Sequence, residues 1–434
     1  MNNTKNTNKI NKTAQSTAAT SATAAPAPNK HRISDIVSIV LFLAILFGFA
    51  VTFVVMPDAS RNSFETGLQT FPNANNRENT YKGADYVLHG EMADDMDEYF
   101  CDQFPLRKAF VTLKALAETI SYRGINNGVL NAGDYLVDVR FDSVGVGANT
   151  EYYSKDHVQS SLESLKTALD GLSVPADVIL PPRKIDVVGP VIGYPTYIGD
   201  MLNEQAIDIL GDYYVDVRPV FYERWDTEMV QTYYATDHHW NCVGAYYAFE
   251  TWANRWLDVE LNYESYEFFT VKYDFLGTSG RNGNYFTHPG DNMYVINFDK
   301  MDQLTLKTGS NLNAMKKQVG IYDMEALSSS DPYNVYLYGK SAYSTITNEN
   351  EERETVLIIK DSFAHNFAPF LARYCDVVMV DLDMYGGSNP NAVMELNSLV
   401  EKTGADRVLV LYNMQNVIET EKLDMIQTKD INKQ

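Results

Sequence analysis

Apolar positions divide the chain into stretches of different character. Residues 1–34 are rich in Asn, Thr and Ala and show no apolar period. Such a segment cannot bury enough surface to offset the entropy of ordering its backbone, so we expect a disordered tail. Residues 36–56 then form an uncharged apolar run of 21 residues, long enough to cross a bilayer as one helix. The pattern predicts a transmembrane helix over residues 35–57.

The flanks of this run predict its orientation. Residues 1–34 contain five Lys and Arg residues and neither Asp nor Glu, and a basic flank of this kind stays in the cytoplasm. An uncleaved anchor is favoured because no small-residue cleavage site follows the run; trimming near residues 56–60 is the alternative. We expect a single-pass plasma membrane protein with a cytoplasmic N-terminus and an extracytoplasmic remainder.

Residues 58–150 are predicted to form a linker and a helical lead-in. The linker is polar and rich in Asn, and apolar residues recur at helical spacing over residues 91–121. Pro105 suits the first turn of a helix, so two helices separated near this residue are expected.

Segments of helical period and apolar runs of strand length alternate over residues 151–425. Three uninterrupted apolar runs, at 356–359, 377–380 and 408–411, are typical of strands covered on both faces. We therefore predict an α/β fold with a mostly parallel, doubly wound sheet. Earlier in this domain we expect helices over 160–169 and 202–210 and strands over 178–180 and 213–217. Residues 257–350 are aromatic and poorly periodic, which predicts an irregular insertion that shapes a pocket, and residues 426–434 are a C-terminal tail.

Composition narrows the functional classes. The chain has 35 Lys and Arg against 57 Asp and Glu, a formal charge of −22. It would repel polyphosphate, so no nucleic-acid partner is expected. Cys101, Cys242 and Cys375 are widely spaced with no CxxC pair, which argues against a disulfide framework or a zinc cluster and allows one bridge at most. We expect neither a cofactor nor a bound metal.

Candidate chemistry follows the three apolar runs, since ligands gather at the carboxyl ends of parallel strands. The first run leads to Asp361 and Ser362, and a serine at a strand-to-helix turn can act as a nucleophile beside N–H groups that hold an oxyanion. The second run leads to Gly386 and Gly387, and the third to Asn413. The glycine amides and the asparagine side chain are candidate oxyanion donors.

A serine nucleophile requires a base and an acid that orients the base. The sequence TDHHW at residues 236–240 holds the only adjacent pair among the seven histidines. Asp237 can turn toward Nδ1 of His239 and leave Nε2 for Ser362, which predicts a Ser362, His239 and Asp237 triad. His238 is then a packing residue, and His365 is the alternative base.

Each residue also has a structural explanation. Ser362 and Asp237 can simply cap helices, adjacent histidines can be packed, and paired glycines can form a turn. In a further alternative, Asp237, His238 and His239 ligate manganese in a DHH-type phosphoesterase.

With TDHHW and KDSF (360–363), the sequence closely resembles the DHHW protein family of bacterial surface proteins. That family is similar to the alginate O-acetylation proteins of the SGNH hydrolase-like superfamily. Matching segments span about residues 85 to 415 and include DQFPLR (102–107), GVLNAGDYLV (128–137), PPRK (181–184), FLGT (275–278) and VLVLYN (408–413).

The resemblance implies an SGNH-like sheet and residue roles. It makes Ser362 the nucleophile, His239 the base and Asp237 its orienter, with Gly387 and Asn413 as oxyanion donors. Two departures stand out: Lys360 replaces the glycine of the usual GDS block, and the Asp and His precede the serine. The alginate-type proteins share this permuted order.

The leading hypothesis is an extracytoplasmic O-acyltransferase, expected to transfer acetyl groups to a cell-surface or secreted polysaccharide through an acyl-serine. The resemblance implies a membrane-bound O-acyltransferase partner that delivers the acyl group. The alternatives are a carbohydrate esterase with the same triad and a non-catalytic polysaccharide-binding or assembly protein.

Overall fold

The computed structural model describes residues 32–58, 69–74, 81–121, 124–142, 153–228, 231–387, 389 and 392–428. The chain divides into two units, residues 1–58 and 59–434. Most of the predicted N-terminal tail and residues 429–434 of the C-terminal tail lie outside the described residues.

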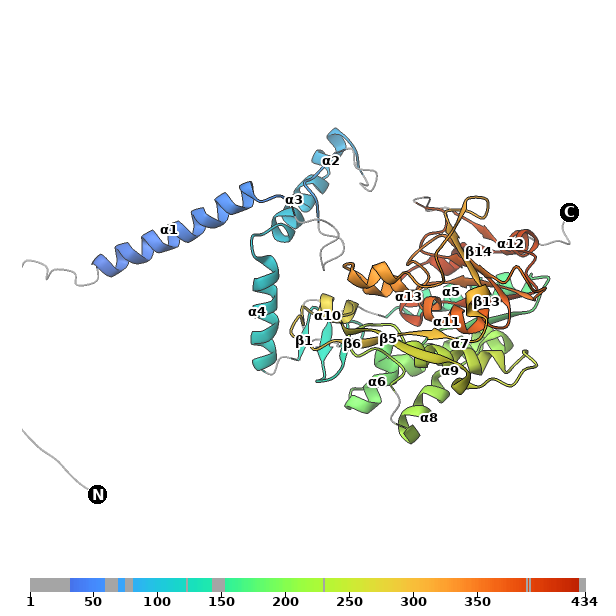
Figure 1. Ribbon diagram of the computed structural model, residues 1–434. Helices are drawn as coiled ribbons and strands as arrows, with labels where there is room; N and C mark the ends of the chain where they lie inside the picture. The colour runs from blue at the N-terminus through green and yellow to red at the C-terminus, as the bar shows by residue number, and fades with distance from the viewer. Residues whose placement is uncertain are drawn as a thin grey trace, which may run out of the picture. The chain divides into compact units, whose positions relative to one another are not determined.

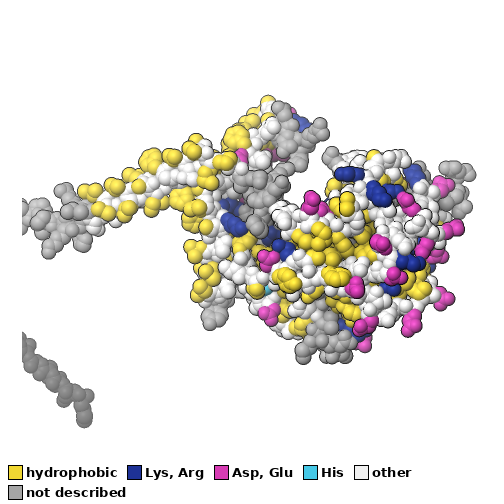
Figure 2. Space-filling model, viewed as in Figure 1, with side chains coloured by type: hydrophobic (Ala, Val, Ile, Leu, Met, Phe, Trp, Pro, Cys, Tyr) yellow, Lys and Arg dark blue, Asp and Glu magenta, His cyan; other side chains and the backbone are white. Residues whose placement is uncertain are grey.

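The first unit contains one long apolar helix, α1 (Arg32–Val55). Its segment Ser34–Val55 is long and apolar enough to cross a membrane. Apolar side chains cover its surface from end to end (Figure 2). This agrees with the predicted span, while the orientation and the membrane stay predictions.

The second unit begins with the helices α2 (Ala84–Leu88), α3 (Glu91–Asp102) and α4 (Arg107–Ile120). The expected break near Pro105 is confirmed, because α3 ends three residues before it and α4 begins two residues after it. A small antiparallel sheet that we did not predict follows: β1 (Ile125–Asn126), β2 (Val129–Asn131) and β3 (Leu136–Asp138). The backbone N–H of Leu136 donates to the carbonyl of Ala235 at 2.9 Å, which ties β3 to the TDHHW loop.

The central sheet has seven strands in the order β4-β13-β10-β11-β9-β7-β8. The four strands β4 (Ala176–Ile179), β13 (Arg407–Leu411), β10 (Thr355–Lys360) and β11 (Asp376–Asp381) are parallel. The three strands β9 (Tyr343–Thr347), β7 (Thr305–Gly309) and β8 (Met315–Lys317) continue the sheet with antiparallel pairing. The three apolar runs are therefore strands, as predicted.

Helices cover both faces of this sheet. Val356 and Ile358 of β10 pack with α8 (Arg218–Glu228), α9 (Cys242–Ala253) and α11 (Ala364–Ala372). Leu357 and Ile359 pack on the other face. There they meet α5 (Lys155–Asp170), α7 (Tyr197–Leu210), α12 (Leu396–Thr403) and α13 (Met414–Glu419). Figure 1 shows the green α8 and α9 at the lower side of this body and the red α12 at its upper side. The uninterrupted apolar runs thus reflect burial on both faces.

The remaining α-helices and strands lie outside the central sheet. They are α6 (Lys184–Ile192), α10 (Thr278–Asn282), the pair β5 (Glu267–Phe275) and β6 (Asp291–Asn297), and the pair β12 (Met394–Glu395) and β14 (Ile426–Gln427).

Two sequence predictions were wrong. In place of a strand over 213–217, only Tyr214 forms a bridge, to Val178. The carboxylate of Asp216 accepts the N–H of Arg218 at 2.9 Å and turns the chain into α8 before a strand can continue. The region 257–350 is not irregular, because it holds β5 to β9, but its residues Thr278, Ser279 and Asn282 do line a pocket. Its strands β7 (TLKTG) and β9 (YSTIT) are mostly polar, so no apolar run announced them.

Candidate active site

Ser362 lies in the turn between β10 and α11, and Asp361 fixes that turn. The buried Asp361 carboxylate accepts the N–H groups of Phe363 at 2.9 Å and of Asn413 at 2.7 Å, and the Nδ2 of Asn416 at 2.7 Å. It therefore connects the end of β10 to the end of β13. Burial raises the pKa of Asp361 to about 6, although these hydrogen bonds oppose the change.

The side chain of Ser362 does not cap α11. Phe363 occupies the cap position of α11, and the Ser362 hydroxyl bonds to His239 instead. Asp237 likewise does not cap α9, because Asn241 caps that helix through its own side chain. The helix-cap explanations of these two residues are therefore wrong.

The TDHHW loop is held against the serine turn by Trp240. Its buried indole Nε1 donates to the carbonyl of Phe363 at 3.0 Å and to Oδ1 of Asn366 at 2.7 Å. In return, Nδ2 of Asn366 donates to the carbonyl of Trp240 at 3.0 Å. The Asp291 carboxylate accepts the N–H groups of Ala235 and Thr236 at 2.6 and 2.8 Å, which fixes the start of the loop. The two segments are thereby locked in register.

Asp237, His239 and Ser362 form one chain of hydrogen bonds. Nδ1 of His239 lies 2.5 Å from Oδ1 of Asp237, and Nε2 of His239 lies 2.7 Å from Oγ of Ser362. These are the contacts that a base needs to accept the serine proton while an acid orients it.

Asp237 is held as an ionised acceptor. Its Oδ1 also accepts the N–H of His239 at 2.9 Å, and its Oδ2 accepts the N–H and Oγ1–H of Thr278 at 2.7 and 3.0 Å. Burial alone would raise the pKa of this carboxyl, but the two histidines and the hydrogen bonds hold it well below the ordinary value. A Cβ on Gly277 would lie 2.2 Å from Cβ of Asp237, so the backbone of FLGT can approach only as glycine.

Aromatic rings pack on both sides of His239. The ring of Tyr333 stacks on it with centroids 4.0 Å apart, and the ring of His238 lies 3.8 Å away. Only 6% of the His239 side chain is exposed, against 44% for His238. Packing therefore restricts the orientation of the base.

The other predicted residues lie in different places. Asn413 is buried beside the turn, where its Nδ2 donates to the carbonyl of Pro181 at 3.1 Å and its Oδ1 caps α13. Gly387 is exposed in a turn, with its N–H directed to the carbonyl of Met384. It has the positive φ of 58° that favours glycine, and it does not line the pocket described below.

Lys360, at the end of β10, and His365, in the first turn of α11, are both buried in the core. Nζ of Lys360 donates to the Asp381 carboxylate and, at 3.0 Å, to Nε2 of His365. Burial lowers the pKa of His365 well below its ordinary value. Among the described residues, it is His239 and not His365 that bonds to the Ser362 hydroxyl.

Asp237, His238 and His239 also place three potential ligand atoms within 4.8 Å of one another. The Asp237 carboxylate and Nδ1 of His239 already bond to each other, and Nδ1 of His238 bonds to Oγ1 of Thr278. A metal ion would have to replace these hydrogen bonds, so the arrangement favours the triad.

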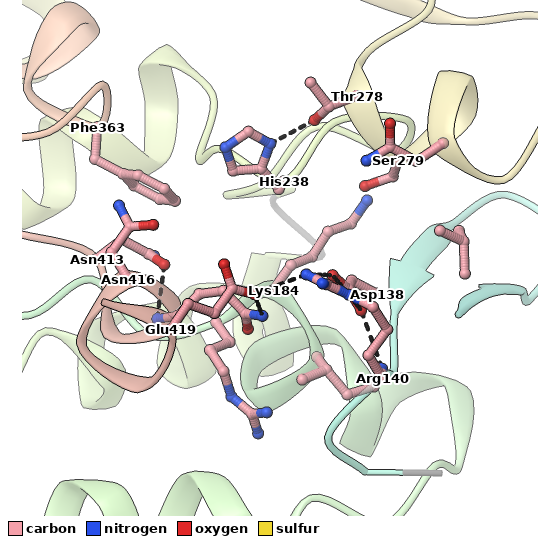
Figure 3. A pocket seen from close by; sticks show the side chains of 15 residues that line it. Asp138, Arg140, Lys184, His238, Thr278, Ser279, Phe363, Asn413, Asn416 and Glu419 are labelled. Carbon is pink, nitrogen blue, oxygen red and sulfur yellow. Dashed lines mark hydrogen bonds and ion pairs between the residues drawn. The ribbon is translucent and has the colours of Figure 1, made fainter. Parts of the chain in front are cut away.

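A pocket of about 230 Å³ adjoins the triad (Figure 3). Phe363, the neighbour of the serine, and His238, the neighbour of the base, form one side of it. The rest of its wall is largely polar: Val129, Asp138, Arg140, Arg183, Lys184, Ile185, Thr278, Ser279, Asn282, Asn413, Gln415, Asn416 and Glu419.

Sequence reasoning missed Thr278 and Tyr333. FLGT was noted as a matching segment, but nothing in the sequence indicated that Thr278 bonds to Asp237. Tyr333 is one of 29 tyrosines, and no local pattern distinguishes it.

The resemblance found in the sequence is confirmed by comparison with known proteins. The model of the DHHW protein family matches residues 219–381, which contain both TDHHW and KDSF. A search of curated proteins found no significant match.

Of the solved structures, a DHHW family protein from Eubacterium siraeum matches 70% of this chain and 97% of its own, with 15% identity and a TM-score of 0.51. Bacillus cereus PatB1 with a sulfonyl adduct matches 69% of this chain and 100% of its own, with 16% identity and a TM-score of 0.54. The O-acetyltransferase domain of Pseudomonas putida AlgJ matches 68% of this chain and 93% of its own, with 11% identity and a TM-score of 0.41. At these identities the first two structures show a shared fold.

Proposed function

We propose that this chain, with its DHHW match, is an extracytoplasmic, SGNH-like O-acyltransferase that transfers acetyl groups to a polysaccharide. The observation that carries the proposal is the hydrogen-bond chain from Asp237 through His239 to Ser362. PatB1, which shares the fold, has been solved with a sulfonyl adduct, and sulfonyl reagents characteristically modify activated nucleophiles.

The first half-reaction acylates the serine. Nε2 of His239 takes the proton of Ser362 as Oγ bonds to the carbonyl carbon of an acyl donor, giving a tetrahedral intermediate. When that intermediate collapses, the bond to the donor's leaving group breaks and His239 returns the proton to the leaving group. The product is an acetyl ester on Ser362. We assign delivery of the acyl group to a membrane-bound O-acyltransferase partner.

The second half-reaction transfers the acetyl group. A sugar hydroxyl attacks the ester carbonyl while His239 accepts its proton, and Oγ of Ser362 leaves and takes the proton back. Asp237 remains ionised and stabilises the imidazolium in both halves. The oxyanion needs donors that are aimed at it, and we assign this role to the amide of Asn413 and the N–H of Gly387. For this role, Nδ2 of Asn413 must release the carbonyl of Pro181, and the turn at Gly387 must move toward the serine.

The proposal is tested in cells that carry Ser362→Ala at the native locus. Ester-linked acetyl groups on the surface or secreted polysaccharide should be lost, while the protein remains at the membrane in normal amount. Ser310→Ala, which changes an exposed serine after β7, is the matched control and should leave acetylation intact. Normal acetylation in the Ser362→Ala cells would contradict the proposal, and loss of ester cleavage without loss of transfer would point to an esterase.

The proposed topology has its own test. With α1 as an anchor and the N-terminus in the cytoplasm, protease added to intact protoplasts should digest residues after 58 and spare a tag at the N-terminus. Protection of the larger unit would overturn the extracytoplasmic assignment.

A further inference from the structure

We infer that the pocket beside the triad binds a neutral, hydroxyl-bearing sugar residue of the acceptor, and that His238 positions this sugar by accepting a hydrogen bond at Nε2. The inference rests on the proposed function and adds the class of acceptor and a positioning residue.

The hydrogen bonds of Thr278 determine the proton position on His238. The Thr278 hydroxyl has one proton, and it donates this proton to the ionised carboxylate of Asp237 at 3.0 Å. Oγ1 of Thr278 can therefore only accept from Nδ1 of His238, which is its partner in a short contact. His238 thus carries a proton on Nδ1. Desolvation by the surrounding groups and the neighbouring His239 lower the pKa of His238, so the ring is neutral near pH 7.

A neutral histidine with its proton on Nδ1 presents a lone pair at Nε2. Figure 3 shows Nδ1 of His238 directed to Thr278 and the other ring nitrogen on the side of Phe363. The rings of His238 and Phe363 are 6.0 Å apart, and both residues line the pocket. With 44% of its side chain exposed, His238 can receive a donor from a bound molecule. A sugar hydroxyl is such a donor.

The opposite wall of the pocket also accepts hydrogen bonds more readily than it donates them. Arg140 lies between two half-exposed carboxylates, at 2.8 Å from Asp138 and 2.7 Å from Glu419. One cation between two anions leaves this part of the wall with net negative charge, which suits hydroxyl donors and disfavours a carboxylate ligand.

The other two cations of the wall are already engaged. Arg183 is buried, with Asp142 at 2.8 Å and Asp186 at 2.6 Å. Nζ of Lys184 donates to three backbone carbonyls, of Leu136, Ala235 and Asp237, at 2.8, 2.6 and 3.1 Å. In the part of the chain that the structure describes, every Lys or Arg that lines the pocket thus has protein partners. A uronic acid would find no cation ready to pair with its carboxylate.

The kinetic test uses the full chain in detergent micelles with a chromogenic acetyl donor. The acceptors are methyl glycosides of glucose, galactose and mannose, each compared with its uronate, which differs only in the group at C6. His238→Asn keeps a group at the Nδ1 position and loses the one at Nε2, whereas His238→Gln keeps a group that can accept near Nε2. The control is His157→Asn on α5, outside the pocket.

We expect the acceptor KM to rise about 10-fold in His238→Asn and to stay within about 3-fold of wild type in His238→Gln, because the first variant leaves the sugar hydroxyl without its partner. The uronates should have a KM at least about 10-fold above that of the neutral glycosides. An unchanged KM in His238→Asn, or uronates that equal or surpass the neutral sugars, would overturn the inference.

A binding measurement separates this inference from the proposed function. Saturation-transfer NMR on the Ser362→Ala protein should detect the neutral glycosides, and adding His238→Asn should weaken their binding about 10-fold. If this pattern holds but no acetyl-serine forms in wild type, the proposed function fails and the pocket assignment stands. If acetyl-serine forms but neither binding nor KM depends on His238, the pocket assignment fails alone.

Discussion

The two sides of the TDHHW loop differ in what surrounds their histidines. His239 lies on a closed side, packed against Tyr333 and bonded through both nitrogens to Asp237 and Ser362. His238, the next residue, lies on an open side, where it bonds to Thr278 and lines a pocket. Packing around the closed side fixes one ring for proton transfer, and the pocket leaves the other ring accessible to a ligand. Neighbours in sequence therefore have different proposed roles because their surroundings differ.

The largest effect is expected on the closed side. Ser362→Ala and His239→Ala should each reduce acyl transfer at least about 10³-fold, and the double variant should be scarcely worse, because residues of one triad act as a unit. Single-turnover kinetics with a chromogenic donor measures the effect. The thermal midpoint of Ser362→Ala should change little, since only a half-buried hydroxyl is removed. Losses that multiply in the double variant would rule against the triad.

Thr278 connects the two sides, so Thr278→Val should affect both. The variant keeps the backbone N–H to Asp237 and loses the hydroxyl that bonds to Asp237 and to His238. We expect acylation to slow about 10-fold, because one hydrogen bond to the orienting carboxylate is lost. Thr287→Val, at a threonine of another pocket, is the control. Acylation at the wild-type rate would show that the Thr278 hydroxyl does not support the base.

On the open side, His238→Asn and His238→Gln should retain measurable acyl transfer after treatment with a chelator. The triad needs no metal, so manganese or zinc should neither restore nor enhance the activity of these variants. His239→Asn should lose activity under the same conditions. Equal loss in both positions, rescued by either metal, would favour a metal site at Asp237, His238 and His239.

The smallest expected effect is a pH dependence of stability from Asp361, beneath the serine. Its pKa is raised to about 6 in the folded chain, above the value of about 3.9 for a free aspartate. The folded state therefore holds the proton more tightly, and this contribution to stability is present below pH 4 and lost as the pH rises through 6. Thermal unfolding of wild type and Asp361→Asn over this window measures it. The decline assigned to Asp361 should be absent in the variant, and identical slopes would contradict the assignment.

The sequence was sufficient for features with a local signal. Uninterrupted apolar runs predicted β10, β11 and β13 because burial on both faces requires them. The spacing of Asp237 and His239, with a serine at a strand end, predicted side chains that the structure brings together.

Features that depend on distant contacts were not predictable. Thr278 reaches Asp237 across 41 positions, and Tyr333 stacks on His239 from a short 3₁₀ turn, Pro332–Val335. Lys360, which replaces the glycine of the usual GDS block, lies in the core, where the distant Asp381 pairs with it. Gly387 lies in an exposed turn, so its proposed oxyanion role depends on a movement of that turn that no local pattern predicts.

The central claim is that Ser362 becomes acylated, and peptide mass spectrometry tests it directly. The full chain in detergent micelles is exposed briefly to an activated acetyl ester, quenched in acid and digested. We predict one acetyl group on the peptide that contains Ser362, absent from the Ser362→Ala and His239→Ala proteins and removed when a neutral sugar acceptor is added before the quench. An unmodified Ser362 peptide, or equal acetylation in the His239→Ala protein, would contradict the account.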